Sequence, residues 1–95
     1  MLVLKALSND KRLKILQWLK EPKKHFKSSV CDIESDGVCV GLIEKKTGLS
    51  QSTASQYLAL LQQAGLIITE RKGQWTYCKR NEQTLKELVK TLGQL

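Results

Sequence analysis

Apolar residues recur at helical spacing in the first quarter of the 95-residue chain. Their pattern predicts a short opening helix over residues 2–7 and a longer helix from about residue 10, which Pro22 should end. Ser8 or Asn9 is expected to cap the longer helix. Its apolar side holds Leu13, Ile15, Leu16 and Leu19, and its solvent side holds Lys11, Arg12, Lys14 and Lys20.

Two further helical runs follow, with a glycine between them. In residues 40–47, Val40, Ile43 and Thr47 face inward, whereas Glu44, Lys45 and Lys46 face outward. Gly48 should end this run in the left-handed conformation, and Ser50 should start the next helix. The next helix has Ala54, Leu58 and Leu61 on one stripe. Two helices joined by a short glycine-containing turn are typical of a helix-turn-helix.

The front of the second of these helices carries Ser, Thr and Gln side chains and no charge. Gln and Ser can pair with base edges in the major groove, whereas Lys and Arg mainly grip phosphates. The pattern therefore predicts a DNA-recognition helix. Its best base-reading candidates are Gln51, Ser52, Ser55 and Gln56, while Ser50 and Thr53 are expected to cap the helix or bind phosphate.

A basic β-hairpin is expected directly after this helix. Residues 66–71 are rich in β-branched residues, Lys72–Gly73 is a plausible turn, and residues 74–79 form the return strand. Such a hairpin can lie along DNA as a wing. The expected contacts with the DNA backbone are Lys45, Lys46, Tyr57, Arg71, Lys72 and Gln74.

The last apolar run, residues 82–95, predicts another amphipathic helix. The core of so small a domain cannot accommodate all the apolar residues of this helix together with those of residues 2–7. The surplus indicates a homodimer whose interface is built by the two terminal helices. The candidate interface residues are Leu2, Val3, Leu7, Leu85, Leu88, Val89 and Leu92.

Composition supports this picture. The chain has 41% apolar residues and is expected to form one globular domain over residues 1–95. Sixteen Lys and Arg against nine Asp and Glu give a net charge of +7, which favours a polyanionic partner such as nucleic acid or an anionic membrane surface. The uncharged residues 47–69 hold too much Ser, Thr and Gln for a transmembrane helix, and no signal peptide is expected.

The order of these motifs resembles one known family. The matching segments are Leu7–Leu16, Val40–Leu61, Ala64–Leu66 and Arg71–Tyr77, and together they resemble the ArsR/SmtB family of winged-helix repressors. The resemblance implies a mainly α winged helix-turn-helix with a β-hairpin wing, in the order α-α-α-α-β-β-α. It implies a homodimeric bacterial or archaeal repressor, which in the cytoplasm would associate with the nucleoid and bind double-stranded DNA. Residues 21–37 depart from the family pattern as a loop insertion with no regular element, apart from a possible short strand at 30–33 or 38–40.

The resemblance also raises the question of a sensed signal. Cys39-Val40-Gly41 matches the Cys-Val-Cys metal motif of arsenic sensors but lacks its second thiol, and soft metals need two or three. Cys31 and Cys39 are therefore only weak metal candidates, and no cofactor is expected. The same two residues could form a redox switch, because a loop can bring them within disulfide reach. Alternatively, Cys39 is a small buried apolar residue and Cys78 only fills space on a strand.

Other functional classes are less consistent with the sequence. No nucleophile–His–acid set, Gly-rich phosphate loop or metal-ligand cluster predicts an enzyme. A winged helix can also serve as a protein-interaction module. That alternative would place acidic or apolar residues at the front of the recognition helix, where this chain has Ser and Gln. A thiol- or metal-responsive form of the repressor is the other open alternative.

Overall fold

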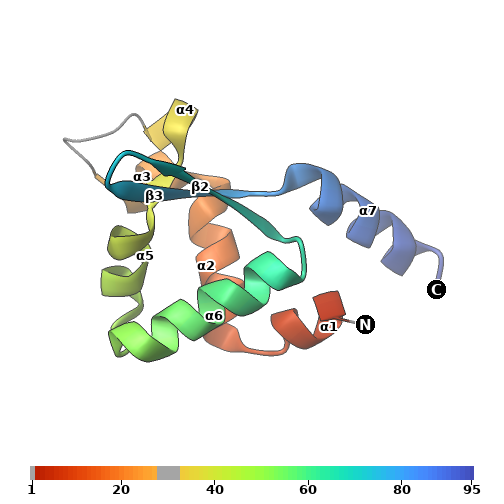
Figure 1. Ribbon diagram of the computed structural model, residues 1–95. Helices are drawn as coiled ribbons and strands as arrows, with labels where there is room; N and C mark the ends of the chain where they lie inside the picture. Colours follow the sequence, from red (N-terminus) through yellow and green to blue (C-terminus); the bar gives the residue numbers. More distant parts are fainter. Residues whose placement is uncertain (1, 28–32) are drawn as a thin grey trace.

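The computed structural model describes residues 2–27 and 33–95 (Figure 1). The chain is mainly helical with an antiparallel sheet, as predicted. The elements in order are α1 (Leu2–Leu7), α2 (Asp10–Lys20), α3 (Pro22–His25), α4 (Ile33–Asp36), β1 (Val38–Cys39), α5 (Val40–Thr47), α6 (Gln51–Gln63), β2 (Ile67–Lys72), β3 (Trp75–Arg80) and α7 (Glu82–Gly93). The predicted order α-α-α-α-β-β-α is thus extended by α3, α4 and β1, all within or beside the insertion.

The core lies where α2, α5 and α6 meet the sheet. Ile15, Ile43 and Leu61 contribute one fully buried side chain from each of these helices. Asn9 caps α2, because its side chain accepts hydrogen bonds from the backbone N–H groups of Lys11 and Arg12. The expected inward position of Leu13 is wrong, since this side chain is 39% exposed. The buried stripe runs instead through Arg12, Ile15, Leu16 and Leu19, at positions i, i+3, i+4 and i+7.

The expected position of Arg12 on the solvent side of α2 is also wrong. Its side chain is only 9% exposed, and its Nε donates to the carbonyl oxygen of Ala6 at 2.5 Å. Its Nη2 donates to the carbonyl oxygen of Lys5 at 3.3 Å. The last carbonyls of α1 have no partner within that helix, so the guanidinium satisfies them and joins α1 to α2.

The sheet has the strand order β1-β3-β2, and both pairings are antiparallel. Lys72 pairs with Trp75, so the turn consists of Gly73 and Gln74 and not of Lys72 and Gly73 as predicted. Gly73 has a φ of 62°. A two-residue hairpin loop with glycine in its first position is typical of a type II′ turn, which places Lys72 within β2.

The insertion is more regular than the sequence indicated. It forms α3 and α4, and the possible strand at 38–40 is present as β1, whereas residues 30–32 of the other candidate strand lie outside the described residues. Phe26 and Ile33 are buried, and the Phe26 ring meets the Trp18 ring edge-on at 6.3 Å between centroids. Gly37, with a φ of 97°, leaves no room for a Cβ atom, which would lie 2.7 Å from the carbonyl oxygen of Cys78. Among the described residues of the insertion, these two separated apolar side chains anchor it, and they are too few to produce a periodic pattern.

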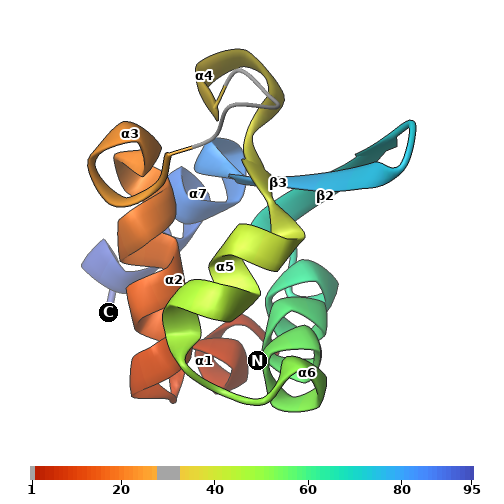
Figure 2. The same cartoon turned by 90° about the vertical axis from the view of Figure 1, so that its left-hand side faces the viewer.

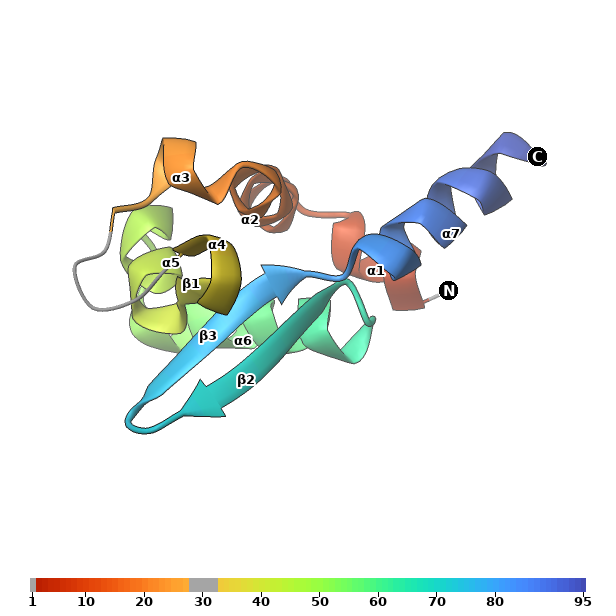
Figure 3. The same ribbon diagram turned by 90° about the horizontal axis from the view of Figure 1, so that it is seen from above.

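The molecule is elongated, with extents of 44 × 27 × 23 Å. The turn of the β2–β3 hairpin and the first residues of α6 lie on one side, whereas α1 and α7 lie on the opposite side (Figures 1 and 3). Seen from the hairpin side, α5 and α6 lie side by side and the hairpin projects beyond them (Figure 2). The α7 helix extends away from the rest of the molecule (Figure 3).

Candidate nucleic-acid interface

The turn between α5 and α6 is held by three hydroxyl side chains. Gly48 ends α5 with a φ of 71°. The Thr47 hydroxyl donates to the carbonyl oxygen of Glu44 at 2.6 Å and accepts from the Leu49 N–H at 3.2 Å. The Ser50 hydroxyl accepts from the Thr53 N–H at 3.1 Å, which confirms Ser50 as the cap. Ser50 also donates to the Thr53 hydroxyl at 2.9 Å, so the predicted helix-turn-helix has well-defined ends.

The two faces of α6 differ as the sequence predicted. Ala54, Leu58 and Leu61 are buried against the rest of the chain. The exposed side chains at the start of α6 include Gln51, Ser52, Ser55 and Gln56. Their positions i, i+1, i+4 and i+5 share one face of the helix. The structure therefore brings the four candidate base readers together on one hydrogen-bonding surface.

Two predicted backbone contacts have partners within the chain. The Tyr57 ring lies under the Arg12 guanidinium, 5.0 Å from its central carbon, and the Tyr57 hydroxyl accepts from Asn9 Nδ2 at 3.4 Å. The Lys46 ammonium lies over the Trp18 ring at 5.2 Å and the Phe26 ring at 5.7 Å. Tyr57 and Lys46 thus each contact another part of the chain, and their contacts with DNA stay a prediction. Lys45 and Lys46 are both exposed, and Lys45 lines a shallow groove between α5 and the start of α6.

One residue of this surface was not selected from the sequence. Ser55 Oγ donates a hydrogen bond to Glu44 Oε2 at 2.5 Å, which places a carboxylate beside the candidate base readers. In the sequence, Glu44 is only a solvent-side residue of an amphipathic helix. The contact joins residues eleven positions apart in two helices, so no local pattern could have revealed it.

The wing carries exposed Arg71, Lys72 and Gln74 near its turn, as expected. Arg71 Nε donates to the carbonyl oxygen of Gly73 at 3.3 Å. Lys72 Nζ lies 2.9 Å from Asp36 Oδ1 at the end of α4. The hydrogen bond and charge of Asp36 raise the pKa of Lys72. The insertion therefore touches the wing through an ion pair.

The candidate interface residues of α1 and α7 divide into two groups. Leu2, Val89 and Leu92 are exposed by 50%, 69% and 45%. Leu88 is only 9% exposed, which differs from the expectation of an unpaired seam residue. Val3, Leu7 and Leu85 are half-buried and pack against the core. Among residues 2–27 and 33–95, the first group and the exposed Leu4 and Leu95 leave an apolar surface open on α1 and α7.

Of the two cysteine candidates, Cys31 lies outside the described residues. Cys39 and Cys78 are both buried, on the neighbouring strands β1 and β3. Burial raises the pKa of the Cys78 thiol to about 12, so this thiol is a poor nucleophile near neutral pH. Among residues 2–27 and 33–95, no three His, Cys, Asp or Glu side chains gather as a metal site would require.

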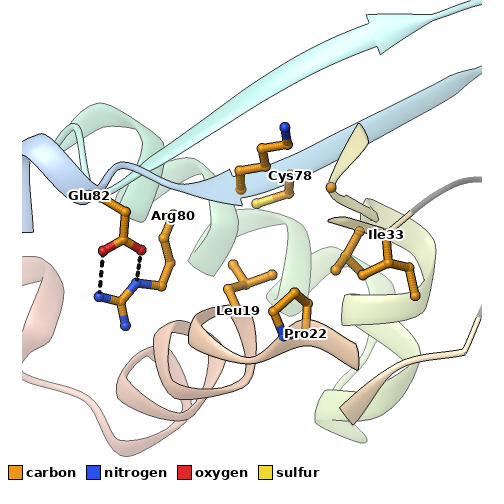
Figure 4. Close-up of a pocket in the computed structure, with 9 residues that line it drawn as sticks. Leu19, Pro22, Ile33, Cys78, Arg80 and Glu82 are labelled. Carbon is orange, nitrogen blue, oxygen red and sulfur yellow. Dashed lines mark hydrogen bonds and ion pairs between the residues drawn. The ribbon is translucent and has the colours of Figure 1, made fainter. Parts of the chain in front are cut away.

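A cavity of about 200 Å³ lies under the insertion, lined by residues that include Leu19, Pro22, Ile33 and Cys78 (Figure 4). Ligand pockets usually measure roughly 300–1,000 Å³, so this cavity is small for one. Arg80 and Glu82 also line it and form an ion pair, with 2.9 Å between Arg80 Nε and Glu82 Oε1. The helix-turn-helix and wing are thus the stronger candidate site.

Comparison with known proteins agrees with this geometry. Residues 34–69 match the family described as "Bacterial regulatory protein, arsR family". A Bacillus subtilis (strain 168) protein, "Uncharacterized HTH-type transcriptional regulator YbzH", is 53% identical over 88 residues, which cover 92% of this chain and 88% of the relative. The chain belongs to the ArsR family. Another relative of this ArsR-family regulator, "Putative arsenical resistance operon repressor ArsR2" of Halobacterium salinarum (strain ATCC 700922 / JCM 11081 / NRC-1), is 36% identical, with 98% and 67% of the two chains covered.

A solved structure supports the same assignment for the fold. The homodimeric winged helix-turn-helix DNA-binding domain Mb0332 from Mycobacterium bovis matches with a TM-score of 0.65 and 29% identity, covering 98% of this chain and 76% of the other. The ArsR-family regulator therefore has a winged helix-turn-helix fold and belongs to a family of transcriptional regulators, not of enzymes. Within its described residues, no helix has the length and apolar character needed to cross a bilayer.

Proposed function

We propose that this ArsR-family regulator is a homodimeric repressor that binds a palindromic operator in double-stranded DNA. The observation that carries the proposal is the composition of the exposed face of α6. Gln51, Ser52, Ser55 and Gln56 present uncharged hydrogen-bonding groups there, while the opposite stripe is buried. Side chains of this kind can pair with base edges in the major groove, whereas contacts with phosphate alone carry no sequence information.

In the proposed complex, the first half of α6 enters the major groove. Gln56 and Gln51 can each make a bidentate contact with an adenine. Arg71 and Gln74 of the wing follow the neighbouring DNA backbone, as does Lys45 from α5. The net charge of +7 supplies the long-range attraction that brings the protein to DNA.

The dimer is proposed to form through the exposed apolar residues of α1 and α7. Leu2, Val89 and Leu92 would be covered by a second copy, and the two α6 helices would face successive major grooves, roughly 34 Å apart on one side of the duplex. The Mycobacterium bovis domain, which is described as homodimeric, supports the formation of a dimer. Repression is inferred from the Halobacterium relative, which is described as a repressor. A protein acting in this way would reside in the cytoplasm, with the nucleoid.

The proposal is tested by selection of bound DNA from a random duplex library, followed by sequencing and by affinity measurements across salt concentrations. We expect a palindrome with half-sites about one helical turn apart, and affinity for it at least about 10³-fold above that for random duplex. Equal affinity for all sequences would contradict operator recognition. A single unrepeated half-site would contradict the dimeric mode of binding. Transcription from a promoter that contains the selected site should fall when the protein is added.

A further inference from the structure

The contact between Glu44 and Ser55 changes what the recognition surface can read. A serine hydroxyl has one donor and two acceptor positions, and a carboxylate only accepts. The Ser55 proton is directed to Glu44 Oε2, 2.5 Å away. Both side chains can therefore offer only acceptors to a base that approaches them.

The location of this pair is the surface that would face the bases. Ser55 is exposed and lies one helical turn after Gln51, on the same side of α6. Glu44 and Gln51 line the same shallow groove between α5 and α6. A carboxylate in this position is thus beside two of the proposed base readers and is not on a remote solvated face.

The Glu44 carboxylate is not held in an ion pair by Lys45, the cation that lines the same groove. Within residues 2–27 and 33–95, Glu44 takes part in no ion pair, and its one hydrogen-bonding side-chain partner there is the neutral Ser55. A negative charge on a DNA-facing surface weakens binding to phosphate and to acceptor-bearing bases. Such a group lowers affinity for every sequence except one that offers it a donor.

In the major groove, only cytosine and adenine offer an amino donor, whereas guanine offers two acceptors and thymine offers an acceptor and a methyl group. Adenine also places its N7 acceptor beside its amino group, where it would face the carboxylate. Cytosine offers the amino group alone, which is the contact that Glu makes with bases. We propose that Glu44, with Ser55, is a specificity-determining residue that selects cytosine at one position of each operator half-site.

The inference rests on the proposed function, and its test uses the complete chain with duplexes selected by the wild-type protein. At one half-site position we expect cytosine, with a loss of at least about 10-fold in affinity for any other base. In Glu44→Gln the amide keeps the size of the side chain but can also donate. Discrimination at that position should fall below about 3-fold and guanine or thymine should become acceptable, while preferences at other positions stay unchanged.

Two further variants separate base selection from simple packing and from charge. Ser55→Ala should also weaken discrimination at that position, and its thermal unfolding temperature should stay close to that of the wild type. Glu87→Gln removes the same charge from an exposed position on α7 and should leave every base preference unchanged.

The possible outcomes distinguish the inference from the proposed function. An unchanged base profile in Glu44→Gln, or a uniform gain in affinity for all duplexes, overturns the role of Glu44 even when the protein binds an operator. A wild-type protein with no sequence preference overturns the proposed function itself. Relaxed discrimination confined to one position in both Glu44→Gln and Ser55→Ala supports the inference.

Discussion

The ammonium of Lys72, beside the turn of the wing, lies 2.9 Å from the Asp36 carboxylate at the end of α4. The pair joins the insertion to the part of the molecule proposed to contact the DNA backbone. While Asp36 holds it, Lys72 contributes less to phosphate binding than its charge alone would suggest. An exposed pair of this kind adds little to stability, so its effect should appear in DNA binding.

We therefore expect Asp36→Asn to raise affinity for any duplex by a few-fold at low salt, because Lys72 becomes available to phosphate. The slope of log affinity against log salt should steepen by up to about one unit. Asp10→Asn, at an exposed position in α2, is the control for the change in net charge. Equal steepening in both variants would show that the Lys72 contact is unimportant. The measurement is fluorescence anisotropy with labelled duplex between low and moderate salt.

Gln56 should contribute to sequence recognition and not to general affinity. We expect Gln56→Ala to lower operator affinity by about 10-fold or more, since a good bidentate pair contributes roughly 1–3 kcal/mol of discrimination. Affinity for random duplex should stay nearly constant. Gln63→Ala, an exposed glutamine at the other end of α6, is the matched control and should leave both affinities unchanged. Equal losses on operator and random duplex in Gln56→Ala would contradict base reading.

Val89 is 69% exposed on the apolar stripe of α7, where the second copy is proposed to pack. A buried unpaired charge at an interface is strongly unfavourable, so Val89→Asp should convert the dimer to a monomer. Thr91→Asp places the same charge on the same helix, away from the apolar stripe, and should leave the dimer intact. Sedimentation or light scattering would measure the mass, and circular dichroism would confirm that both variants stay folded. A dimeric Val89→Asp protein would place the interface elsewhere.

The hydrogen bonds from Arg12 to the last carbonyls of α1 predict a stability effect. Arg12→Met keeps much of the volume but leaves the carbonyl oxygen of Ala6 without its donor. We expect the free energy of unfolding to fall by about 1–3 kcal/mol, the cost of a buried unsatisfied group. Lys14→Met, at an exposed position of the same helix, should change it by less than about 0.5 kcal/mol. Equal effects in urea unfolding would show that Arg12 contributes only through charge.

The buried Cys78 thiol predicts a loss of stability at high pH. In the unfolded chain a thiol ionises near pH 9.0, but in the folded chain burial raises the pKa of Cys78 to about 12. The folded state therefore keeps a proton that the unfolded state releases, and stability falls as pH rises between these values. From this group alone, the free energy of unfolding should fall by about 1.4 kcal/mol per pH unit.

Cys78→Ala removes this group and isolates its contribution. The variant is expected to be less stable at neutral pH because of the cavity it leaves, but its stability should fall less steeply above pH 9. The difference in slope between wild type and variant, measured by urea unfolding, is the relevant quantity. Parallel curves would mean that the Cys78 thiol ionises equally easily in both states.

Local features of the chain were predictable because they depend on neighbouring residues. Gly48 and Ser50 mark the ends of two helices through backbone conformation and capping, which need no distant partner. The apolar stripe of α6 and the polar face that it leaves outward follow from the helical repeat. Together with the hairpin, these features were sufficient to predict a DNA-binding winged helix-turn-helix.

Contacts between distant segments were decided by the tertiary structure. The crossing of α5 and α6 joins Glu44 to Ser55, and the docking of the insertion brings Asp36 to Lys72. The burial of Arg12 could not be predicted from the sequence, because a charged residue at the edge of an apolar stripe is normally exposed. Arg12 is buried because the end of α1 packs against it and accepts its hydrogen bond. A one-dimensional pattern determines which side of an element is apolar. Only the packing of the elements determines which polar groups contact one another. In this protein these contacts are proposed to set both the base preference and the charge of the DNA-facing surface.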